Sequence, residues 1–457
     1  MTRARRDLAG SRVLVVGLAR SGRAAVDLLL ETGSRVVATD LRSAEALGLD
    51  PTSWLERGAE LSLGEQPTSL LDDAELIVVS PGVPLTAPLL KTAAQRGIEI
   101  IGELELGYQM SEATWVAITG TNGKTTTTAL TGELVRTTGR SVLVGGNIGN
   151  AVSHEAAGVP ADGVIVAEVS SFQLDTIDRF RPTVGALLNI TEDHLDRYDG
   201  FDDYANSKMR LFANQTPDDV AVLFVDDPEV SSRVAGVGGR IVPVSVEREL
   251  EDGVFVRGGS VVSRIGGSEQ EIVEVSELGL PGPHNLVNSM VAFATASVVG
   301  VAPEEAAEVL KRFRSLEHRL EFVRELDGVA YVNDSKATNV DAVRFALQSY
   351  EHPIVWIAGG KEKGADFTAL RGPASERVRA AILIGEATGK LERALDGAVE
   401  MVRAGTLDEA VRMARELAER ADIVLLSPAC ASFDMFQDFE DRGRQFKNAV
   451  MALGDAR

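Results

Sequence analysis

Short runs of Val, Ile and Leu alternate with amphipathic segments of helical length from Arg12 onward. Parallel sheets covered by helices on both faces need such continuous apolar strands, so the pattern predicts an α/β fold. A first compact domain is expected to end near Gly102. Its expected strands lie at 12–19, 35–40, 75–82 and 98–102, with helices at 21–33 and 88–97.

The alternation resumes twice more along the chain. A strand at 115–120, the loop TNGKT and a helix through Arg136 are followed by strands at 163–170 and 183–190. Helices from Asn285 and Pro303 close this part, and the glycine-punctuated 254–277 segment is expected to form a small antiparallel appendage. A third series starts near Leu316. At roughly 100 to 200 residues per domain, we expect three domains at 1–102, 103–315 and 316–457.

Charge and composition narrow the class of protein. The chain has 457 residues, 44% of them hydrophobic, and a formal charge of −22, which is unfavourable for nucleic-acid binding. The apolar run from Met290 is well short of the ~20 residues that span a bilayer, so it is read as a buried helix. No signal peptide is recognised, and the single cysteine, Cys430, is interpreted as a small buried hydrophobe, so we expect a cytoplasmic protein that binds no membrane. We also expect a monomer.

The strongest chemical signal is the loop GTNGKT between an apolar strand and a helix. Its backbone N–H groups and the helix N-terminus can surround a phosphate chain. Lys124 would lie against the β- and γ-phosphates, and the Thr125 hydroxyl on Mg²⁺. Ile118 stands where the usual P-loop has its first glycine, so the motif is the shorter Gly-x-x-Gly-Lys-Thr form. The expected nucleotide-binding residues of the loop are Gly120, Asn122, Gly123, Lys124, Thr125 and Thr126.

Two acidic segments follow neighbouring strands. Glu168 ends the strand at 163–170, where a carboxylate can complete the Mg²⁺ shell begun by Thr125. The segment TEDHLDRY groups His194 with acids after the next strand. Lys208 comes fourteen residues later in an expected helix, and spacing alone favours a solvated lysine there.

The N-terminal turn Gly17-Leu-Ala-Arg-Ser-Gly22 approaches the dinucleotide fingerprint, with Asp40 ending the next strand. Ala19 replaces the middle glycine that lets a pyrophosphate approach the backbone. Because the turn is still close to the fingerprint, a nicotinamide oxidoreductase is one alternative function for the chain. A P-loop switch that controls a partner is another. The turn remains able to hold some nucleotide diphosphate.

Three polar loops follow strands of the third domain: NDSKATN, GGKEKG and SPACASF. Because parallel strands end at one sheet edge, these loops are expected to gather into an anion pocket.

The strings GTNGKTT, GGNIGN, EVSSFQL, NITEDHLDRY, GPHN, EHR, NDSKATN and SPACASFD occur in this order along nearly the whole chain. In this respect the sequence resembles the Mur ligases. NDSKATN and SPACAS indicate the members that add D-glutamate to UDP-N-acetylmuramoyl-L-alanine. The resemblance implies a Rossmann-like UDP-binding domain, a central P-loop-type ATPase domain and a C-terminal Rossmann-like domain that binds the amino acid and caps ATP.

The resemblance also implies roles for individual residues. ATP and two Mg²⁺ ions are expected, one held by Thr125 and Glu168, the other by His194 and by Lys208 carrying CO₂ as a carbamate. Further ATP contacts would come from Asn285, Asn288, Arg319 and Asp334. The UDP-linked substrate would meet Arg20, Ser21, Asp40, Leu41, Arg42, Gly82, Asn147, Ser170 and Gln173. The D-glutamate pocket would contain Lys336, Thr338, Lys363, Ser432, Phe433 and Phe439.

Overall fold

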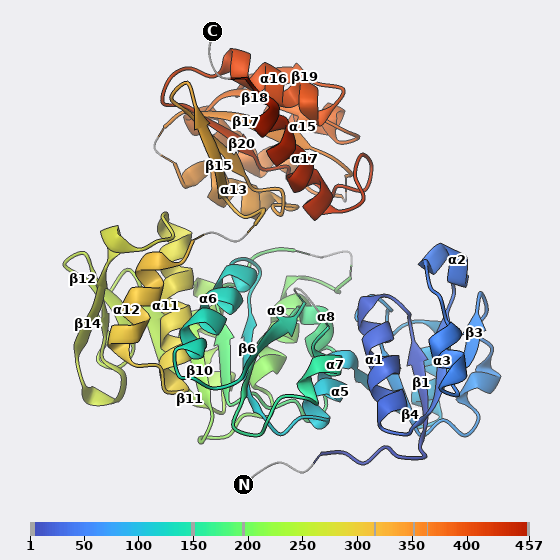
Figure 1. The fold of residues 1–457 in the computed structure, drawn as a ribbon. Coiled ribbons are helices and arrows are strands. Elements are labelled where there is room, and N and C mark those ends of the chain that lie inside the picture. The colour runs from blue at the N-terminus through green and yellow to red at the C-terminus, as the bar shows by residue number, and fades with distance from the viewer. Residues whose placement is uncertain are drawn as a thin grey trace. The chain divides into compact units, whose positions relative to one another are not determined.

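The fold is that of a computed structural model, which describes residues 5–147, 151–193, 197–314, 317–350, 352–362 and 364–454. It contains three sheets with helices packed on them, and the predicted three-domain α/β class is confirmed (Figure 1). By contacts, the chain divides into two compact units. One comprises Met1–Glu277 with Val287–Lys311, and the other Leu278–Leu286 with Arg312–Arg457.

The first sheet has five parallel strands in the order β3-β2-β1-β4-β5. Val13 and Val15 pack on one face against α1, while Leu14 and Val16 pack on the other against α4. The order reverses between β1 and β4, which is where such sheets bind ligands. The strands are β1 Arg12–Val16, β2 Arg35–Asp40, β3 Glu60–Leu63, β4 Leu76–Val79 and β5 Glu99–Gly102; the helices are α1 Arg20–Glu31, α2 Ala44–Leu47, α3 Thr52–Glu56 and α4 Pro88–Gln95.

The second sheet has nine strands in the order β14-β13-β12-β11-β10-β9-β6-β8-β7, and the P-loop strand β6 lies inside it. Its parallel part contains β6 Thr114–Thr119, β7 Val142–Gly146, β8 Val164–Glu168, β9 Val184–Leu187, β10 Val220–Phe224 and β11 Arg240–Ser245. The helices of this region are α5 Glu103–Gln109, α6 Lys124–Arg136, α7 Val152–Ala156, α8 Ser171–Leu174, α9 Phe201–Met209, α10 Pro228–Ser232, α11 Pro283–Val298 and α12 Pro303–Arg312.

The 254–277 segment forms a small antiparallel group of strands at the edge of the central sheet. Its strands are β12 Val254–Arg257, β13 Ser260–Ser263 and β14 Gln270–Glu274. They pair with one another in antiparallel fashion, as predicted, but β12 also pairs in parallel with β11. The segment therefore extends the edge of the central sheet, because the backbone groups of β11 offer hydrogen bonds that the sequence pattern does not reveal.

The third sheet has the order β15-β16-β20-β17-β18-β19. Five of its strands run parallel, whereas β15 pairs with β16 in antiparallel fashion and was not predicted. The strands are β15 Glu321–Leu326, β16 Val329–Asn333, β17 Ile354–Gly359, β18 Val378–Ile384, β19 Glu400–Arg403 and β20 Ile423–Leu426; the helices are α13 Val340–Gln348, α14 Arg371–Arg377, α15 Thr388–Leu395, α16 Leu407–Leu417 and α17 Phe439–Ala452. Trp356 faces one core and Val355 the other, as the two-residue period of β17 requires.

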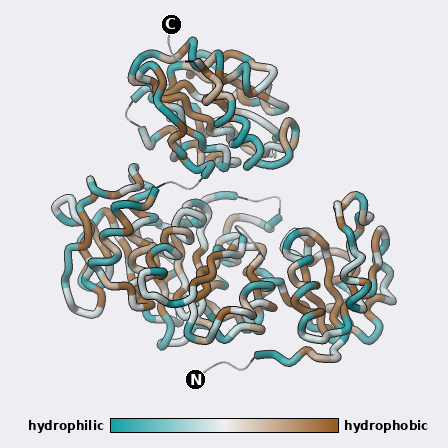
Figure 2. Tube along the Cα trace, in the orientation of Figure 1, coloured by the Kyte–Doolittle hydropathy of each residue, from teal (hydrophilic) through white to brown (hydrophobic). Residues whose placement is uncertain are grey.

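Apolar residues concentrate on the strands and on the inner helix faces, and hydrophilic residues on the loops (Figure 2). The apolar stretch from Met290 is buried within α11, as predicted, and Cys430 is buried as well. Among the helices of the described residues, none has both the length and the apolarity needed to cross a bilayer.

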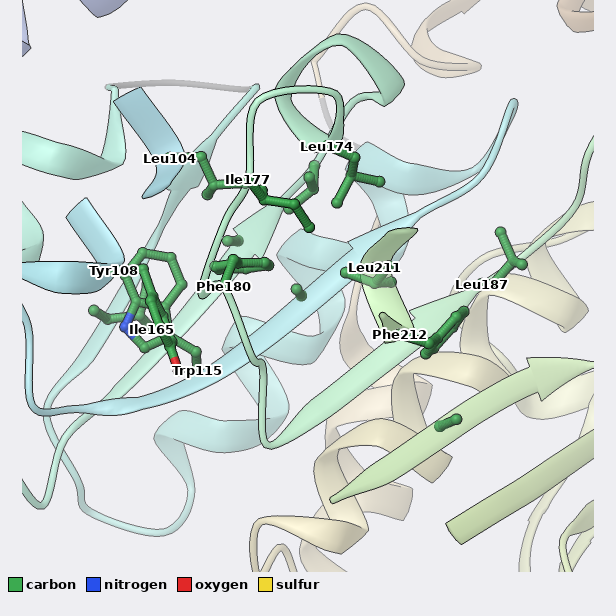
Figure 3. Packing of buried hydrophobic residues seen from close by; sticks show 14 of the residues in the cluster. Leu104, Tyr108, Trp115, Ile165, Leu174, Ile177, Phe180, Leu187, Leu211 and Phe212 are labelled. Atoms are coloured by element: carbon green, nitrogen blue, oxygen red, sulfur yellow. The ribbon is translucent and has the colours of Figure 1, made fainter. Parts of the chain in front are cut away.

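An aromatic cluster anchors α5 to the central sheet (Figure 3). The rings of Tyr108, Trp115 and Phe180 meet edge to face, with centroids 5.1 to 5.8 Å apart. Glu105, on the same helix, is fully buried and accepts hydrogen bonds from the backbone N–H groups of Asp178, Arg179 and Phe180 at 2.8 to 3.1 Å. The carboxylate thus closes the turn that carries Phe180.

Replacing Glu105 should destabilise this part of the fold strongly. Glu105→Ala would leave those buried N–H groups, and the Gln109 amide that also donates to it, without an acceptor. We expect a loss of about 3 kcal/mol or more in unfolding free energy, measured by urea denaturation. Glu112→Ala is the control, because Glu112 is half-exposed and its one ion pair among the described residues is a 3.9 Å contact with Arg5. Equal losses in the two variants would contradict the assignment.

Candidate active site

The GTNGKT loop joins β6 to α6, and Gly123 is the N-cap of the helix. Gly123 has φ +82°, and a Cβ atom there would lie 2.3 Å from Asn288 Oδ1. A side chain at this position would therefore be both strained and blocked. Asn288 also receives the Thr127 hydroxyl at 3.3 Å, which fixes α11 against the loop.

Two lysine ammonium groups converge on one carbonyl oxygen of this loop. Lys124 Nζ donates to Gly120 O at 2.9 Å and to Thr121 O at 2.8 Å. Lys208 Nζ, from α9, donates to the same Gly120 oxygen at 2.9 Å. The Lys124 ammonium therefore brings positive charge to the loop, as a polyphosphate site requires.

Lys208 is buried, with 2% of its surface exposed, so the interpretation of it as a solvated lysine is wrong. Its Nζ lies 4.6 Å from the centre of the Tyr204 ring. Burial, and then repulsion from Lys124, hold the pKa of Lys208 well below that of a free lysine. A neutral amine is therefore accessible here. His194, its expected partner at a metal, lies outside the described residues.

Glu168 ends β8 and is buried beside the loop. Its Oε1 accepts from the Asn147 side chain at 2.7 Å. Its Oε2 is buried and has no hydrogen-bond partner among the described residues. A buried carboxylate oxygen without a donor fits a cation ligand, and Thr125, at the start of α6, is buried too. Arg20 Nη2 donates to the Asn147 carbonyl at 3.1 Å, which links α1 to this carboxylate.

Residues outside the predicted set hold the loop in place. Asn189 accepts from the Asn122 N–H at 2.8 Å and donates to the Asn122 carbonyl at 3.2 Å. Tyr204 is fully buried, and its hydroxyl lies 3.1 Å from that of Thr121. Asn189 lies in NITEDHLDRY after strand β9, and Tyr204 lies in the helix that follows. That location was the only sign in the sequence that they could contact the loop.

At the first sheet, Asp40 closes the β1–α1 turn. Its Oδ2 accepts from the Leu18 N–H at 2.8 Å, and Arg42 pairs with it at 2.9 Å. Burial by itself raises the pKa of Asp40, but the hydrogen bonds from Arg42 and Leu18 outweigh it and bring the pKa to about 2. Leu41, with 69% of its surface exposed, and the guanidinium of Arg42 stand beside this carboxylate.

The remaining expected contacts of the UDP-linked substrate have different surroundings. Ser21 is half-buried in the first turn of α1, and Gly82 is exposed after β4, with open space where a Cβ would stand. Ser170 and Gln173 form a capping box at the start of α8. The Gln173 side chain accepts from the Ser170 N–H at 2.9 Å, so part of its hydrogen-bonding capacity is used locally.

The three polar loops of the third sheet do gather, as predicted. They follow the adjacent strands β16, β20 and β17. Lys361 N donates to Ala431 O at 2.8 Å, and Ala431 N returns a bond to Lys361 O at 3.2 Å. Ser432 is buried after this bridge, whereas Phe433 exposes 65% of its surface. Lys363 lies outside the described residues.

The NDSKATN loop carries Lys336 and Thr338. Lys336 Nζ lies 5.3 Å from the centre of the Phe439 ring, at the start of α17. The Thr338 N–H donates to the Lys336 carbonyl at 2.8 Å, which tightens the turn. The Lys336 ammonium and the Phe439 ring therefore lie together beside this turn.

Asp334 begins the same loop and is buried. Its Oδ2 accepts from the Ser427 hydroxyl at 2.9 Å, and Oδ1 from the Leu320 N–H at 3.3 Å. Burial raises its pKa to about 7, although Ser427 and the nearby Arg319 favour the ionised form. Asn285, another expected ATP contact of this unit, donates its side-chain amide to Pro281 O at 2.8 Å.

Comparison with known proteins covers all three sheets. Residues 11–102 match the Mur ligase MurD-like N-terminal domain, 118–296 the Mur ligase middle domain and 318–430 the Mur ligase glutamate ligase domain. A UDP-N-acetylmuramoylalanine–D-glutamate ligase of Pelotomaculum thermopropionicum is 46% identical over 98% of this chain and 99% of its own. The chain belongs to the Mur ligase family.

Other relatives agree with this membership. A UDP-N-acetylmuramoylalanine–D-glutamate ligase of Geotalea daltonii is 45% identical over 99% of this chain and all of its own. Solved structures of more distant Mur ligases share the fold. A UDP-N-acetylmuramate–alanine ligase of Thermotoga maritima has a TM-score of 0.60 at 17% identity, covering 96% of this chain and 99% of its own; MurF of Acinetobacter baumannii has 0.62 at 16%, covering 97% and 93%. This Mur ligase is an ATP-dependent, ADP-forming ligase of peptidoglycan synthesis.

The raised pKa of Asp334 in this Mur ligase predicts a titration near neutrality. An unfolded aspartate ionises near pH ~4, so between that pH and about 7 the folded carboxyl keeps a proton that the unfolded chain releases. The stability that this group contributes is therefore lost as the pH rises through that window, by at most about 4 kcal/mol. Asp334→Asn should remove this slope in urea unfolding of the ligand-free protein.

Infrared difference spectra report the same proton directly. A protonated-carboxyl stretch should titrate near pH 7 and be absent from Asp334→Asn. Asp366→Asn is the matched control, since Asp366 is exposed in the same unit and its pKa is lowered by hydrogen bonds from Thr368. Persistence of the band in Asp334→Asn, or its loss in Asp366→Asn, would refute the assignment.

Proposed function

We propose that this Mur ligase joins the alanyl carboxylate of UDP-N-acetylmuramoyl-L-alanine to the amine of D-glutamate, with ATP as the energy source, and that it acts as a monomer in the cytoplasm. The observation that supports the substrates most is the 44 to 46% identity, over nearly the whole chain, to relatives named as D-glutamate ligases. The Lys124 ammonium at the GTNGKT loop is consistent with a polyphosphate substrate.

The three parts of the chain would divide the work. Residues 1–102 would hold the UDP portion at the β1–β4 crevice, where Asp40, Leu41 and Arg42 stand together. Residues 103–315 would bind ATP at the GTNGKT loop, and residues 316–457 the amino acid at the three gathered loops. Each proposed site lies at the carboxyl ends of parallel strands, which is where open α/β sheets bind their ligands.

The reaction proceeds in two steps. A carboxylate is a poor electrophile, so the γ-phosphoryl group of ATP is first transferred to the alanyl carboxylate, with release of ADP. The D-glutamate amine then attacks the acyl phosphate, the amide bond forms and inorganic phosphate leaves with the electron pair of the broken C–O bond. Lys124 would neutralise charge on the transferring group, which is mostly a matter of positioning and electrostatics.

Mg²⁺ would supply a cation that neutralises phosphate oxygens during transfer. The unpartnered Oε2 of Glu168 and the hydroxyl of Thr125 fit one ion. Asn147 orients the same carboxylate through Oε1, and Arg20 holds Asn147 in turn. We assign His194 and Lys208 to a second ion.

Lys208 would serve that ion as a carbamate. A neutral amine attacks CO₂, a C–N bond forms and one proton is released to solvent, which converts the neutral side chain into an anionic oxygen ligand. The lowered pKa of Lys208, caused first by burial and then by Lys124, supports the neutral form that this reaction needs. A hard divalent cation accepts such an oxygen.

One assay tests the function: ADP release with UDP-N-acetylmuramoyl-L-alanine and a panel of D- and L-amino acids. We expect release that depends on D-glutamate and fails with the L-enantiomer. Phosphate release independent of any amino acid would indicate a switch instead. NAD(H) binding to the first domain would favour an oxidoreductase, which Ala19 disfavours because its Cβ stands where the fingerprint has a glycine.

The carbamate predicts a dependence on CO₂. Rigorous removal of CO₂ should lower activity and bicarbonate should restore it. Lys208→Ala should lower kcat/KM by about a hundredfold or more, since a ligand of a charge-stabilising cation is lost. With ¹³C-labelled CO₂, a carbamate resonance should be present in the unmodified protein and absent from Lys208→Ala.

Lys91→Ala is the control for that experiment, because Lys91 is exposed on α4. Its carbamate signal and its activity should match the unmodified protein. Full activity of Lys208→Ala together with indifference to CO₂ would eliminate the carbamate.

Two lysines of the GGKEKG loop should differ in their effect on the amino acid. We expect Lys363 and Ser432 to hold the two carboxylates of D-glutamate. Lys363→Ala would leave a carboxylate unpaired, a loss of roughly 2 to 5 kcal/mol, seen as a raised KM for D-glutamate with ATP binding nearly unchanged. Lys361→Ala is the control, because the Lys361 side chain is exposed and only its backbone forms the bridge to Ala431. A reversed pattern would shift the register of the loop.

A further inference from the structure

Arg442 is the one arginine among the largest fully buried side chains of the described residues, and the reaction outlined above does not use it. It lies on α17, one turn into the helix. Its Nε donates to the Ser335 hydroxyl at 2.9 Å and Nη2 to the Ser335 carbonyl at 2.8 Å. Its Nη1 and Nη2 also donate to Cys430 O at 3.2 Å, and Nη1 to Ala431 O at 3.3 Å. One guanidinium thus binds the NDSKATN and SPACASF loops together.

The third loop meets the same group. The Ala431 carbonyl that accepts from Arg442 also accepts from the Lys361 N–H. Gly360 has φ +135°, and a Cβ atom there would lie 2.3 Å from Ala431 O and 3.1 Å from Arg442 Nη1. The GGKEKG loop therefore passes close against the guanidinium because it has no side chain at this point.

The charge of Arg442 has no ion-pair partner among the described residues. No carboxylate there lies within 4.0 Å of its nitrogens, and its hydrogen bonds go to carbonyls and one hydroxyl. The groups whose fields reach it are the Cys430 thiol, Asp434 and Asp334; burial is the largest influence and lowers the pKa of Arg442 to about 10. A buried cation that neutral acceptors hold keeps its net charge and acts strongly through a low-dielectric surrounding.

We propose that Arg442 is a positioning residue for the anionic amino acid: it holds the three loops of the pocket in register, and its uncompensated charge favours a carboxylate there. A neutral side chain could tie loops together, but it would add no positive field for a substrate with two carboxylates. The identity of that anion rests on the proposed function, whereas the joining of the loops does not.

The test compares Arg442→Lys, which keeps the charge, with Arg442→Met, which keeps most of the length. Arg444→Met is the control, since Arg444 lies on the same helix with 55% of its side chain exposed and makes only long ion pairs at 3.9 and 4.0 Å. We expect Arg442→Met to raise the KM for D-glutamate by about tenfold or more and to leave the KM for ATP within about twofold. Arg442→Lys should recover part of that loss, and Arg444→Met should behave as the unmodified enzyme.

A pH profile separates charge from packing. A lysine in this buried site should lose its proton at lower pH than the arginine does, so the KM for D-glutamate of Arg442→Lys, relative to the unmodified enzyme, should rise with pH. A purely structural residue would give a ratio independent of pH. A flat ratio, or equal increases in both KM values, would overturn the electrostatic role.

Hydrogen exchange tests the joining of the loops without any substrate. The backbone amides of Lys361 and Ala431 form mutual hydrogen bonds that depend on the loop register. They should exchange faster in both Arg442 variants than in the unmodified enzyme, and at the unmodified rate in Arg444→Met. Unchanged exchange would overturn the positioning role. If Arg442→Met does not fold, Arg442→Lys carries both measurements. Absence of D-glutamate-dependent ADP release by the unmodified enzyme would refute the proposed function alone, since the exchange experiment is independent of it.

Discussion

Lysine and arginine side chains that donate hydrogen bonds to backbone carbonyl oxygens hold together the polar loops at the strand ends of this Mur ligase. In the central domain the Gly120 carbonyl accepts from Lys124 and Lys208, and in the C-terminal domain loop carbonyls accept from Arg442. The chain as a whole carries a formal charge of −22, so its average field repels phosphates and carboxylates. The side chains of Lys124 and Arg442 bring local positive charge to these loops, opposite in sign to the average field of the chain.

The cost of burying these cations explains the surrounding architecture. A desolvated ammonium or guanidinium is tolerated only where several acceptors are held in fixed positions. The carboxyl ends of parallel strands provide them, because each strand delivers its following loop to the same sheet edge. Asn189 and Tyr204 fix the GTNGKT loop, and the Lys361–Ala431 bridge joins two of the polar loops of the third sheet. Because the loops are held in place, their carbonyl oxygens stay in position to accept hydrogen bonds from the buried cationic side chains.

Some elements escaped prediction for reasons that lie in their length and partners. Strands β3 and β15 are short or only partly buried, so they lack the continuous apolar run that identifies β6 or β17. The 254–274 strands alternate correctly, but their attachment to β11 depends on a free edge far along the chain. Local pattern carries no information about which edge a strand will find.

The sequence by itself determined the α/β class, the P-loop, the three polar loops of the third sheet and, through whole strings such as NDSKATN, the family. These follow from periodicity and from motifs that are contiguous along the chain. Only the tertiary structure decided that Lys208 is buried against Gly120, that Glu168 keeps an unpartnered oxygen and that Arg442 joins separate loops. Burial and pKa depend on groups brought together from distant segments, and spacing along a chain cannot encode the solvent that folding removes.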